Sequence, residues 1–234
     1  MTTAAPPIVA PGPLTPQASL PAEWSLADLQ EHLGGIPAER IRLFPPPGYA
    51  TEEDVIQAAE REGRLCELED GILVEKPMGW YESLLAGVII GEINTFLRRH
   101  NLGKALGADG TVKILPGILK IPDVSFISWK RWPRTRLPRR PVPALVPDLA
   151  VEVLSETNTR REMEDKLHRY FEAGVRLVWY VDPATRAADA YTSPADVKHV
   201  EPSGELDGGE VLPGFRLSLA NLFQFADRQP PEED

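Results

Sequence analysis

Apolar residues recur along this chain at two spacings, and these spacings predict its helices and strands. The clearest helix spans residues 81–100, where apolar side chains three or four positions apart form one face: Leu85, Ile89, Ile93 and Phe96. Further helices are predicted at 24–33, with Ser25 as cap, at 52–62 and at 160–173. Short apolar runs predict a hairpin at 65–74 that turns at Asp70-Gly71, strands at 106–115, 121–127, 147–155, 177–181 and 189–192, and an irregular hairpin at 204–215.

The predicted elements form one domain with tails. From residue 81 onward their order is helix, three strands, helix, strand, which indicates an α/β domain. Residues 1–22 contain six prolines and no charged side chain, so we expect them to be a disordered tail. The chain is therefore divided into the tail 1–22, an N-terminal extension 23–50, the main domain 51–225 and an acidic tail 226–234.

One acid interrupts the most apolar of these strands. Alternate residues of a strand point to opposite faces, so Glu152 shares a face with Ala150 and Leu154 in the middle of a core-like run. An ionised carboxylate at such a position is costly unless a cation meets it. Asp123 is the single charge of the apolar run 121–127, and two carboxylates on adjacent strands with a lysine nearby favour a divalent-metal site.

Asp148 is the rival to Asp123, because each follows a proline. Asp148 precedes Glu152 by four residues on the same strand, roughly 13 Å at about 3.3 Å per residue, so these two could not bind one ion. Asp123 is therefore the preferred ligand. The alternative for Asp123 is an acid at a strand entry that accepts a hydrogen bond from a backbone N–H.

The order of Asp, Glu on a strand and Lys resembles the PD-(D/E)xK nuclease superfamily, and within it the Uma2 family of restriction-type endonucleases. The resemblance covers roughly residues 52–223, and the segments that carry it are 66–71 (CELEDG), 107–109 (GAD), 121–127 (IPDVSFI), 147–155 (PDLAVEVLS), 173–183 (AGVRLVWYVDP) and 212–215 (LPGF). It implies a restriction-endonuclease-like αβββαβ core with a mixed central sheet flanked by helices. It also implies that Asp123, Glu152 and the backbone carbonyl of Val153 hold Mg²⁺ or Mn²⁺.

The superfamily usually has a catalytic lysine where this chain has Leu154, and Lys166 on the following helix resembles the migrated lysine of some of its branches. With Met163 at 0° and about 100° per residue, Lys166 falls at about −60°, inside the apolar arc. A lysine there could lower the pKa of an attacking water. The alternatives are a lysine extending along the edge of that face to solvent, or an ion pair with Glu162.

Two further acids are candidates by resemblance. Glu82 stands where family members often have histidine, so it is a candidate outer metal ligand or water-positioning group. Its alternative role is an acid favoured by the dipole at the start of a helix. Glu67 is similar to the strand glutamate of the family and is a weaker candidate for the same site.

A basic segment follows the Asp123 strand. Residues 128–140 contain six of the chain's 25 Lys and Arg residues, no acid and two tryptophans. Basic groups bind phosphates and aromatic rings stack on exposed bases, so we expect DNA contacts from Lys130, Arg131, Arg134, Arg136, Arg139 and Arg140. The sequence supports an alternative equally well: a solvated loop whose tryptophans pack back on the domain.

Composition limits the class of protein. A net charge of −10 argues against a general nucleic-acid coat protein, although not against a nuclease, since the charge of the groove decides binding. No run approaches 18 apolar residues, so we expect no membrane span. The single Cys66 cannot form an internal disulfide and the N-terminus lacks the basic start of a secretory signal, which together predict a cytoplasmic protein.

The resemblance implies a metal-dependent endonuclease that hydrolyses phosphodiester bonds of DNA, and it also suggests a homodimer. Leu154 and the acidic net charge favour a second hypothesis, a catalytically inactive nuclease fold kept as a binding or regulatory module. A third hypothesis is a metal-dependent phosphohydrolase of small nucleotides, which would need no basic groove.

Overall fold

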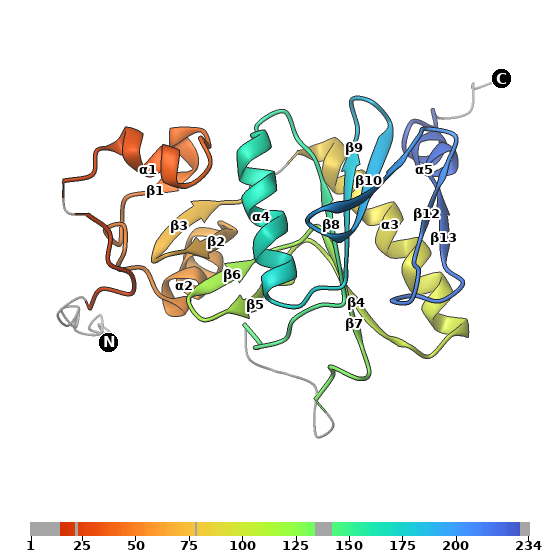
Figure 1. Ribbon diagram of the computed structural model, residues 1–234, viewed down its shortest axis with the longest axis horizontal. Coiled ribbons are helices and arrows are strands. Elements are labelled where there is room, and N and C mark those ends of the chain that lie inside the picture. The colour runs from red at the N-terminus through yellow and green to blue at the C-terminus, as the bar shows by residue number, and fades with distance from the viewer. Residues whose placement is uncertain (1–14, 22, 78, 134–141, 230–234) are drawn as a thin grey trace, which may run out of the picture.

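The computed structural model describes residues 15–21, 23–77, 79–133 and 142–229. Most of the two predicted tails therefore lies outside the described residues. Two sheets stand side by side, with helix α4 (Arg160–Glu172) between them (Figure 1). Within the described ranges, no helix is both long and apolar enough to cross a membrane.

The larger sheet has six strands in the order β11-β10-β9-β8-β7-β4. Strands β8 and β9 are parallel and every other neighbouring pair in this sheet is antiparallel. A parallel pair needs a crossover connection, which α4 provides. The strands are β4 (Gly103–Leu106), β7 (Val124–Ser128), β8 (Leu149–Val153), β9 (Leu177–Asp182), β10 (Ala187–Ser193) and β11 (Asp196–Val200).

The smaller sheet is antiparallel, in the order β1-β3-β2-β6-β5. Its β2–β3 hairpin turns at Asp70 (φ 48°) and Gly71 (φ 71°), the left-handed pair that a two-residue hairpin requires, as the sequence predicted. Its elements are β1 (Ile41–Arg42), β2 (Cys66–Glu69), β3 (Ile72–Glu75), β5 (Val112–Leu115), β6 (Ile118–Lys120) and the covering helix α2 (Glu52–Glu62).

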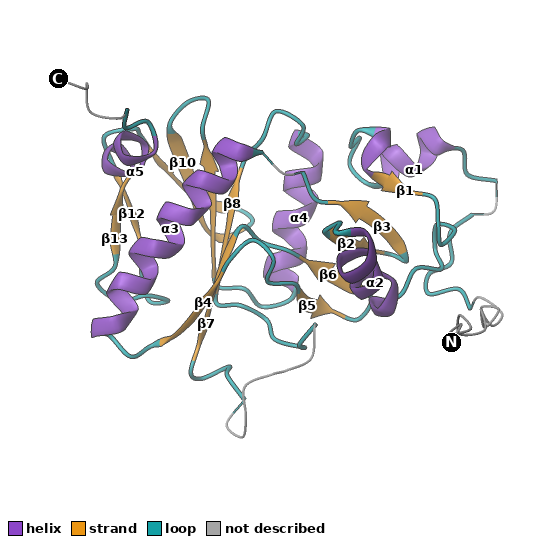
Figure 2. Cartoon of the chain, turned by 180° about the vertical axis from the view of Figure 1, so that it is seen from behind, coloured by secondary structure: helices purple, strands orange, loops and turns teal. Residues whose placement is uncertain are grey.

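The larger sheet is covered on both faces, by α4 on the side seen in Figure 1 and by α3 (Trp80–Arg99) on the side seen in Figure 2. The predicted apolar face of α3 packs with Val151 and Val153 of β8. The opposite face of β8 presents Ala150 to Met163 and Leu167 of α4. This alternation confirms the predicted faces of the Glu152 strand and leaves Glu152 on the side of α4.

Segments at both ends of the chain pack against these sheets. Helix α1 (Leu26–His32) begins at Ser25 with a capping box, and β1 adds a strand to β3 after the short 3₁₀ helix η1 (Ala38–Arg40). The N-terminal extension is thus part of the folded body. At the other end, β12 (Glu205–Asp207) and β13 (Arg216–Ser218) pair, and α5 (Leu219–Ala226) lies beside α3 (Figure 1).

The structure corrects two predicted strands. The run 106–115 is two strands in different sheets, because the chain turns at Gly107-Ala-Asp-Gly110, where the Gly110 N–H donates to the carbonyl of Gly107 at 2.9 Å. The run 121–127 begins later than predicted, at Val124, so Asp123 stands just before β7 and not inside a strand. The sequence analysis also missed β1, β6, β11 and α5.

Candidate active site

Strand register brings the two predicted acids together. Val124 of β7 pairs with Val151 of the antiparallel β8, so the preceding Asp123 lies alongside the following Glu152. Asp123 Oδ2 accepts a hydrogen bond from the backbone N–H of Val153 at 2.7 Å. Asp123, Glu152 and Val153 line one small cavity together with Glu67, Glu82 and Lys166. All the predicted catalytic and metal-binding positions therefore lie in one place.

Lys166 points from α4 into this cavity and lies between two carboxylates. Its Nζ is 2.9 Å from Glu152 Oε1 and 3.0 Å from Glu67 Oε1, and its side chain is only 9% exposed. Tyr170, one turn further along α4, donates its hydroxyl to the same oxygen of Glu152. Neither alternative for Lys166 holds, because the ammonium is buried and Glu162 pairs instead with Arg40, at 2.6 Å.

The carboxylates that share Lys166 have pKa values shifted in opposite directions. Burial would raise the pKa of Glu67, but the ammonium groups of Lys166 and Lys120 outweigh it and hold the pKa well below its ordinary value. Burial raises the pKa of Glu152, because Lys166 offsets it only partly and Asp123 adds to it. Burial would lower the pKa of Lys166, but Glu152 and Glu67 raise it well above its ordinary value. Lys166 is therefore an ammonium near neutral pH, able to donate hydrogen bonds but not to act as a base.

The cavity also contains Lys76, which the sequence analysis missed. Its Nζ lies 2.8 Å from Asp123 Oδ1, and it donates to the carbonyl oxygen of Ile121 at 2.6 Å. Nothing local distinguishes Lys76 in the sequence, because it follows an ordinary strand and precedes Pro77. The end of β3 comes close to Asp123 only because β3 pairs with β2 and β2 pairs with β6.

Glu82 reaches the cavity from the first turn of α3. Its carboxylate lies over Gly79, where a Cβ would come within 1.6 Å of Glu82 Oε2. The glycine is thus required for this orientation of the carboxylate. The structure places Glu82 where an outer ligand could act, and its role in metal binding remains a prediction.

The donor set suits a hard divalent cation of the Mg²⁺ or Mn²⁺ kind. Asp123 and Glu152 supply carboxylate oxygens, and Mg²⁺ is commonly held by one or two carboxylates, with water and substrate phosphate completing its shell. Among the described residues, no three His, Cys, Asp or Glu side chains are grouped so as to hold a metal without such help. Asp123 and Glu152 are therefore the carboxylates that could hold such an ion together with water and a phosphate.

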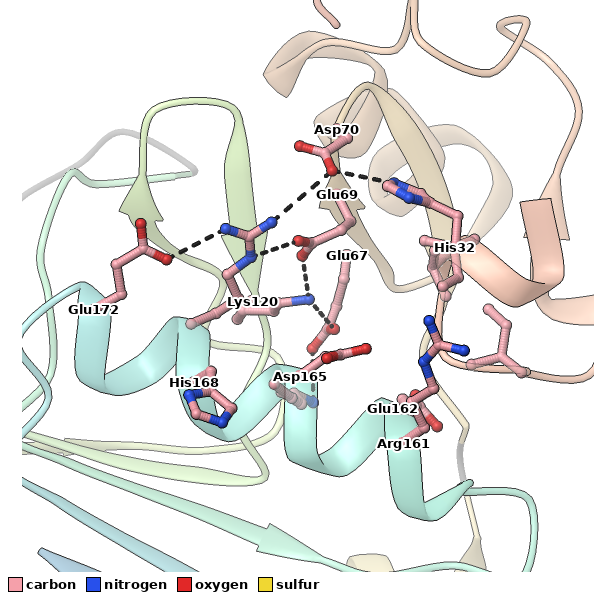
Figure 3. A pocket seen from close by; sticks show the side chains of 15 residues that line it. His32, Glu67, Glu69, Asp70, Lys120, Arg161, Glu162, Asp165, His168 and Glu172 are labelled. Atoms are coloured by element: carbon pink, nitrogen blue, oxygen red, sulfur yellow. Dashed lines mark hydrogen bonds and ion pairs between the residues drawn. The ribbon is translucent and has the colours of Figure 1, made fainter. Parts of the chain in front are cut away.

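Lys166 and Glu67 also border a second pocket, whose lining does not include Asp123. Figure 3 shows this second pocket. This pocket has a volume of about 340 Å³, and His32, Leu33 and Ile36 of the N-terminal extension form one wall. Several of its charged side chains are paired with one another. Lys120 lies 2.7 Å from Glu69, and the hydrogen-bonded His32 and Asp70 are 3.1 Å apart. We assign these pairs to stabilising the wall behind Lys166.

Asp148 is distant from the cavity, as its spacing predicted. It accepts a hydrogen bond from the backbone N–H of Ser128 and forms ion pairs with Arg131 and Arg176, and its side chain is 2% exposed. It therefore ties the start of β8 to the loops around it. Asp148 is a structural acid.

The basic segment begins at the end of β7 that lies away from Asp123. Strand β7 begins beside Asp123 and the segment follows its last residue, Ser128, roughly 17 Å away at about 3.3 Å per residue. Arg131 donates to the carbonyl oxygens of Pro147 and Gly174, and the rings of Trp129 and Trp132 pack edge to face. Lys130 is exposed. Arg134, Arg136, Arg139 and Arg140 lie outside the described residues, and DNA contact by this segment remains a prediction.

A mixed sheet with one acid on β8, a second just before the neighbouring β7 and a lysine from the crossover helix is the arrangement of a restriction-endonuclease-like fold. The chain belongs to the Uma2 family, whose model, described as "Putative restriction endonuclease", matches residues 52–220. A crystal structure described as "a putative nuclease belonging to DUF820 from Anabaena variabilis" has the same fold, with a TM-score of 0.63 and 19% identity over 70% of this chain and 92% of that chain. The search of curated proteins found no match. Nuclease function at this general level follows from the family.

Proposed function

We propose that this protein is a metal-dependent endonuclease that hydrolyses phosphodiester bonds of DNA with Mg²⁺ or Mn²⁺. The observation that carries the proposal is the convergence of Asp123, Glu152 and the ammonium of Lys166 in one cavity, with Lys166 2.9 Å from Glu152. Leu154 at the usual lysine position favoured an inactive module. Lys166 of α4, beside Glu152, supplies the positive charge that Leu154 lacks, and this favours an active enzyme over an inactive module.

Asp123, Glu152 and Lys166 have different roles in hydrolysis. A divalent cation held by Asp123 and Glu152 would polarise the substrate phosphate and lower the pKa of the attacking water. Glu152 is fixed by Lys166 and Tyr170, and Asp123 by the Val153 N–H, so both carboxylates are oriented before substrate arrives. Lys166, as an ammonium, stabilises the negative charge that develops on the phosphate oxygens as the water attacks phosphorus and the bond to the leaving oxygen breaks. The attacking water gives its proton to solvent, and the leaving oxygen takes a proton from solvent.

An open groove leads into the cavity. It is lined by Arg40, Lys76 and Ser155, which it shares with the cavity, and by Arg64. Acids outnumber bases along it: Glu39, Glu75, Glu82, Glu156 and Asp182. This mixed charge keeps a second candidate function open, hydrolysis of a small phosphorylated nucleotide, since the described groove has no continuous basic track for a duplex.

Incubation with supercoiled plasmid DNA tests the proposal. We expect nicking and then linearisation with Mn²⁺ or Mg²⁺, none with EDTA, and none by Asp123→Asn with either metal. A nucleoside triphosphate incubated in parallel should stay intact. Hydrolysis of the nucleotide with intact plasmid would select the second candidate, and hydrolysis of neither substrate with either metal would contradict the proposed function.

A further inference from the structure

Lys76 is a buried cation at the metal-binding carboxylate, and the proposed chemistry does not yet use it. Its side chain is 6% exposed, and its Nζ lies 2.8 Å from Asp123 Oδ1. Two backbone carbonyls also accept from it, Ile121 at 2.6 Å and Ala108 at 3.4 Å. The ammonium therefore has a defined place at the mouth of the site.

The two oxygens of Asp123 have different partners. Oδ2 accepts the N–H of Val153, which belongs to the backbone of β8 and cannot move away without disturbing the strand. Oδ1 is therefore the oxygen that a metal ion can bind, and it is the oxygen that Lys76 contacts. An ammonium and a divalent cation repel each other in a buried site, so the two compete for this oxygen.

The side chain of Lys76 can reach a second position when it leaves Asp123. Its side chain lines both the site cavity and the open groove that leads to it. A lysine has four flexible carbons, so its ammonium can turn toward the groove while the backbone after β3 stays in place. In the groove the ammonium could contact a substrate phosphate, in competition with the acids that line the same groove, such as Glu82.

We propose that Lys76 is a placeholder cation: it neutralises Asp123 in the metal-free protein, gives way to the divalent cation, and then contacts a phosphate of the nucleic-acid substrate. This inference rests on the proposed function, because it needs the metal to bind Asp123. It explains how the Asp123 carboxylate stays oriented without metal. It also makes metal binding and substrate binding support each other, since the displaced ammonium adds to the phosphate site.

Metal affinity without substrate tests the first part of the proposal, that Lys76 occupies Asp123 until a metal ion replaces it. Titration calorimetry with Mn²⁺ should show that Lys76→Met binds the ion about tenfold more tightly than the parent, because no ammonium competes for Oδ1. Lys113→Met is the matched control, since Lys113 pairs with Glu52 outside the cavity and its removal should leave the affinity unchanged. If folding of Lys76→Met is impaired, Mn²⁺ should raise its melting temperature more than it raises that of the parent.

The outcomes separate this inference from the proposed function. Equal or weaker Mn²⁺ binding by Lys76→Met, with clear binding by the parent, would overturn the placeholder role alone. Absence of Mn²⁺ binding in both proteins would overturn the placeholder and the proposed metal site together.

The salt dependence of DNA binding tests the second part of the proposal, that the displaced Lys76 contacts a substrate phosphate. In Ca²⁺, used as a metal that supports binding with little cleavage, the log–log slope of affinity against salt should be shallower by about 0.9 in Lys76→Met, the value for one lost phosphate contact on duplex DNA. Lys113→Met should keep the parental slope. A parental slope in Lys76→Met would overturn the phosphate contact.

Discussion

Lys166→Met should cleave DNA on the order of 10²–10⁴ times more slowly than the parent, the usual effect of removing one positioned proton-donating or proton-accepting group. Methionine keeps most of the apolar stem and removes the ammonium that lies 2.9 Å from Glu152. The loss should appear in kcat more than in KM, because the charge acts on the attacking water and the transition state. Single-turnover cleavage of a labelled duplex in Mn²⁺ measures it.

A second buried lysine provides the control for this variant. Lys120 also contacts Glu67, at 3.4 Å, and Glu69, at 2.7 Å, but it lines the second pocket and not the site cavity. Lys120→Met should therefore lower the free energy of unfolding while cleaving at a rate close to that of the parent. Parental cleavage by Lys166→Met would refute the role of the helix lysine, and an equal loss in both variants would mean that the lysines act only through stability.

Asp123→Asn should weaken Mn²⁺ binding by at least about 100-fold. Removing an outer partner of a metal ligand already costs 10–100-fold, and Asp123 would be a direct ligand. The amide oxygen of asparagine can still accept the Val153 N–H, so the strand pairing should survive. Lys76 loses its carboxylate, however, and we expect a lower free energy of unfolding for that reason. Titration calorimetry and urea unfolding measure the two effects.

Asp148→Asn is the matched control, because Asp148 also follows a proline and is also buried. It breaks ion pairs with Arg131 and Arg176, which should lower the free energy of unfolding by about 3 kcal/mol. Mn²⁺ affinity should stay parental, since Asp148 lies at the other end of β8. If Asp148→Asn lost the metal and Asp123→Asn kept it, the assignment of the two acids would be reversed.

Local pattern was sufficient to find the parts of the site that lie on regular elements. The apolar alternation of β8 predicted which face carries Glu152, and the helical angle predicted that Lys166 points inward from α4. Both predictions use only periodicity, which a buried strand or helix cannot change without exposing its apolar face. The register of β7 against β8 then placed Asp123 beside Glu152.

Long-range contacts could not be predicted in the same way. Lys76 reaches Asp123, and Arg40 reaches Glu162 across 122 positions, only because the smaller sheet packs beside α4. Neither residue has a periodic signal. The glycine-flanked turn 107–110 was hidden inside an apolar run. The basic segment follows the Asp123 strand in sequence, but β7 lies between Asp123 and the first residues of that segment.

A crystal structure with Mn²⁺, located by its anomalous scattering, tests the central claim most directly. The account predicts one strong peak bonded to Asp123 Oδ1 and to a Glu152 oxygen at about 2.1 Å, with the Lys76 ammonium turned away from Asp123. Crystals of Asp123→Asn should lack the peak. A parent crystal in which Lys76 still contacts Asp123 and no manganese lies between Asp123 and Glu152, at an Mn²⁺ concentration that supports cleavage, would contradict the account.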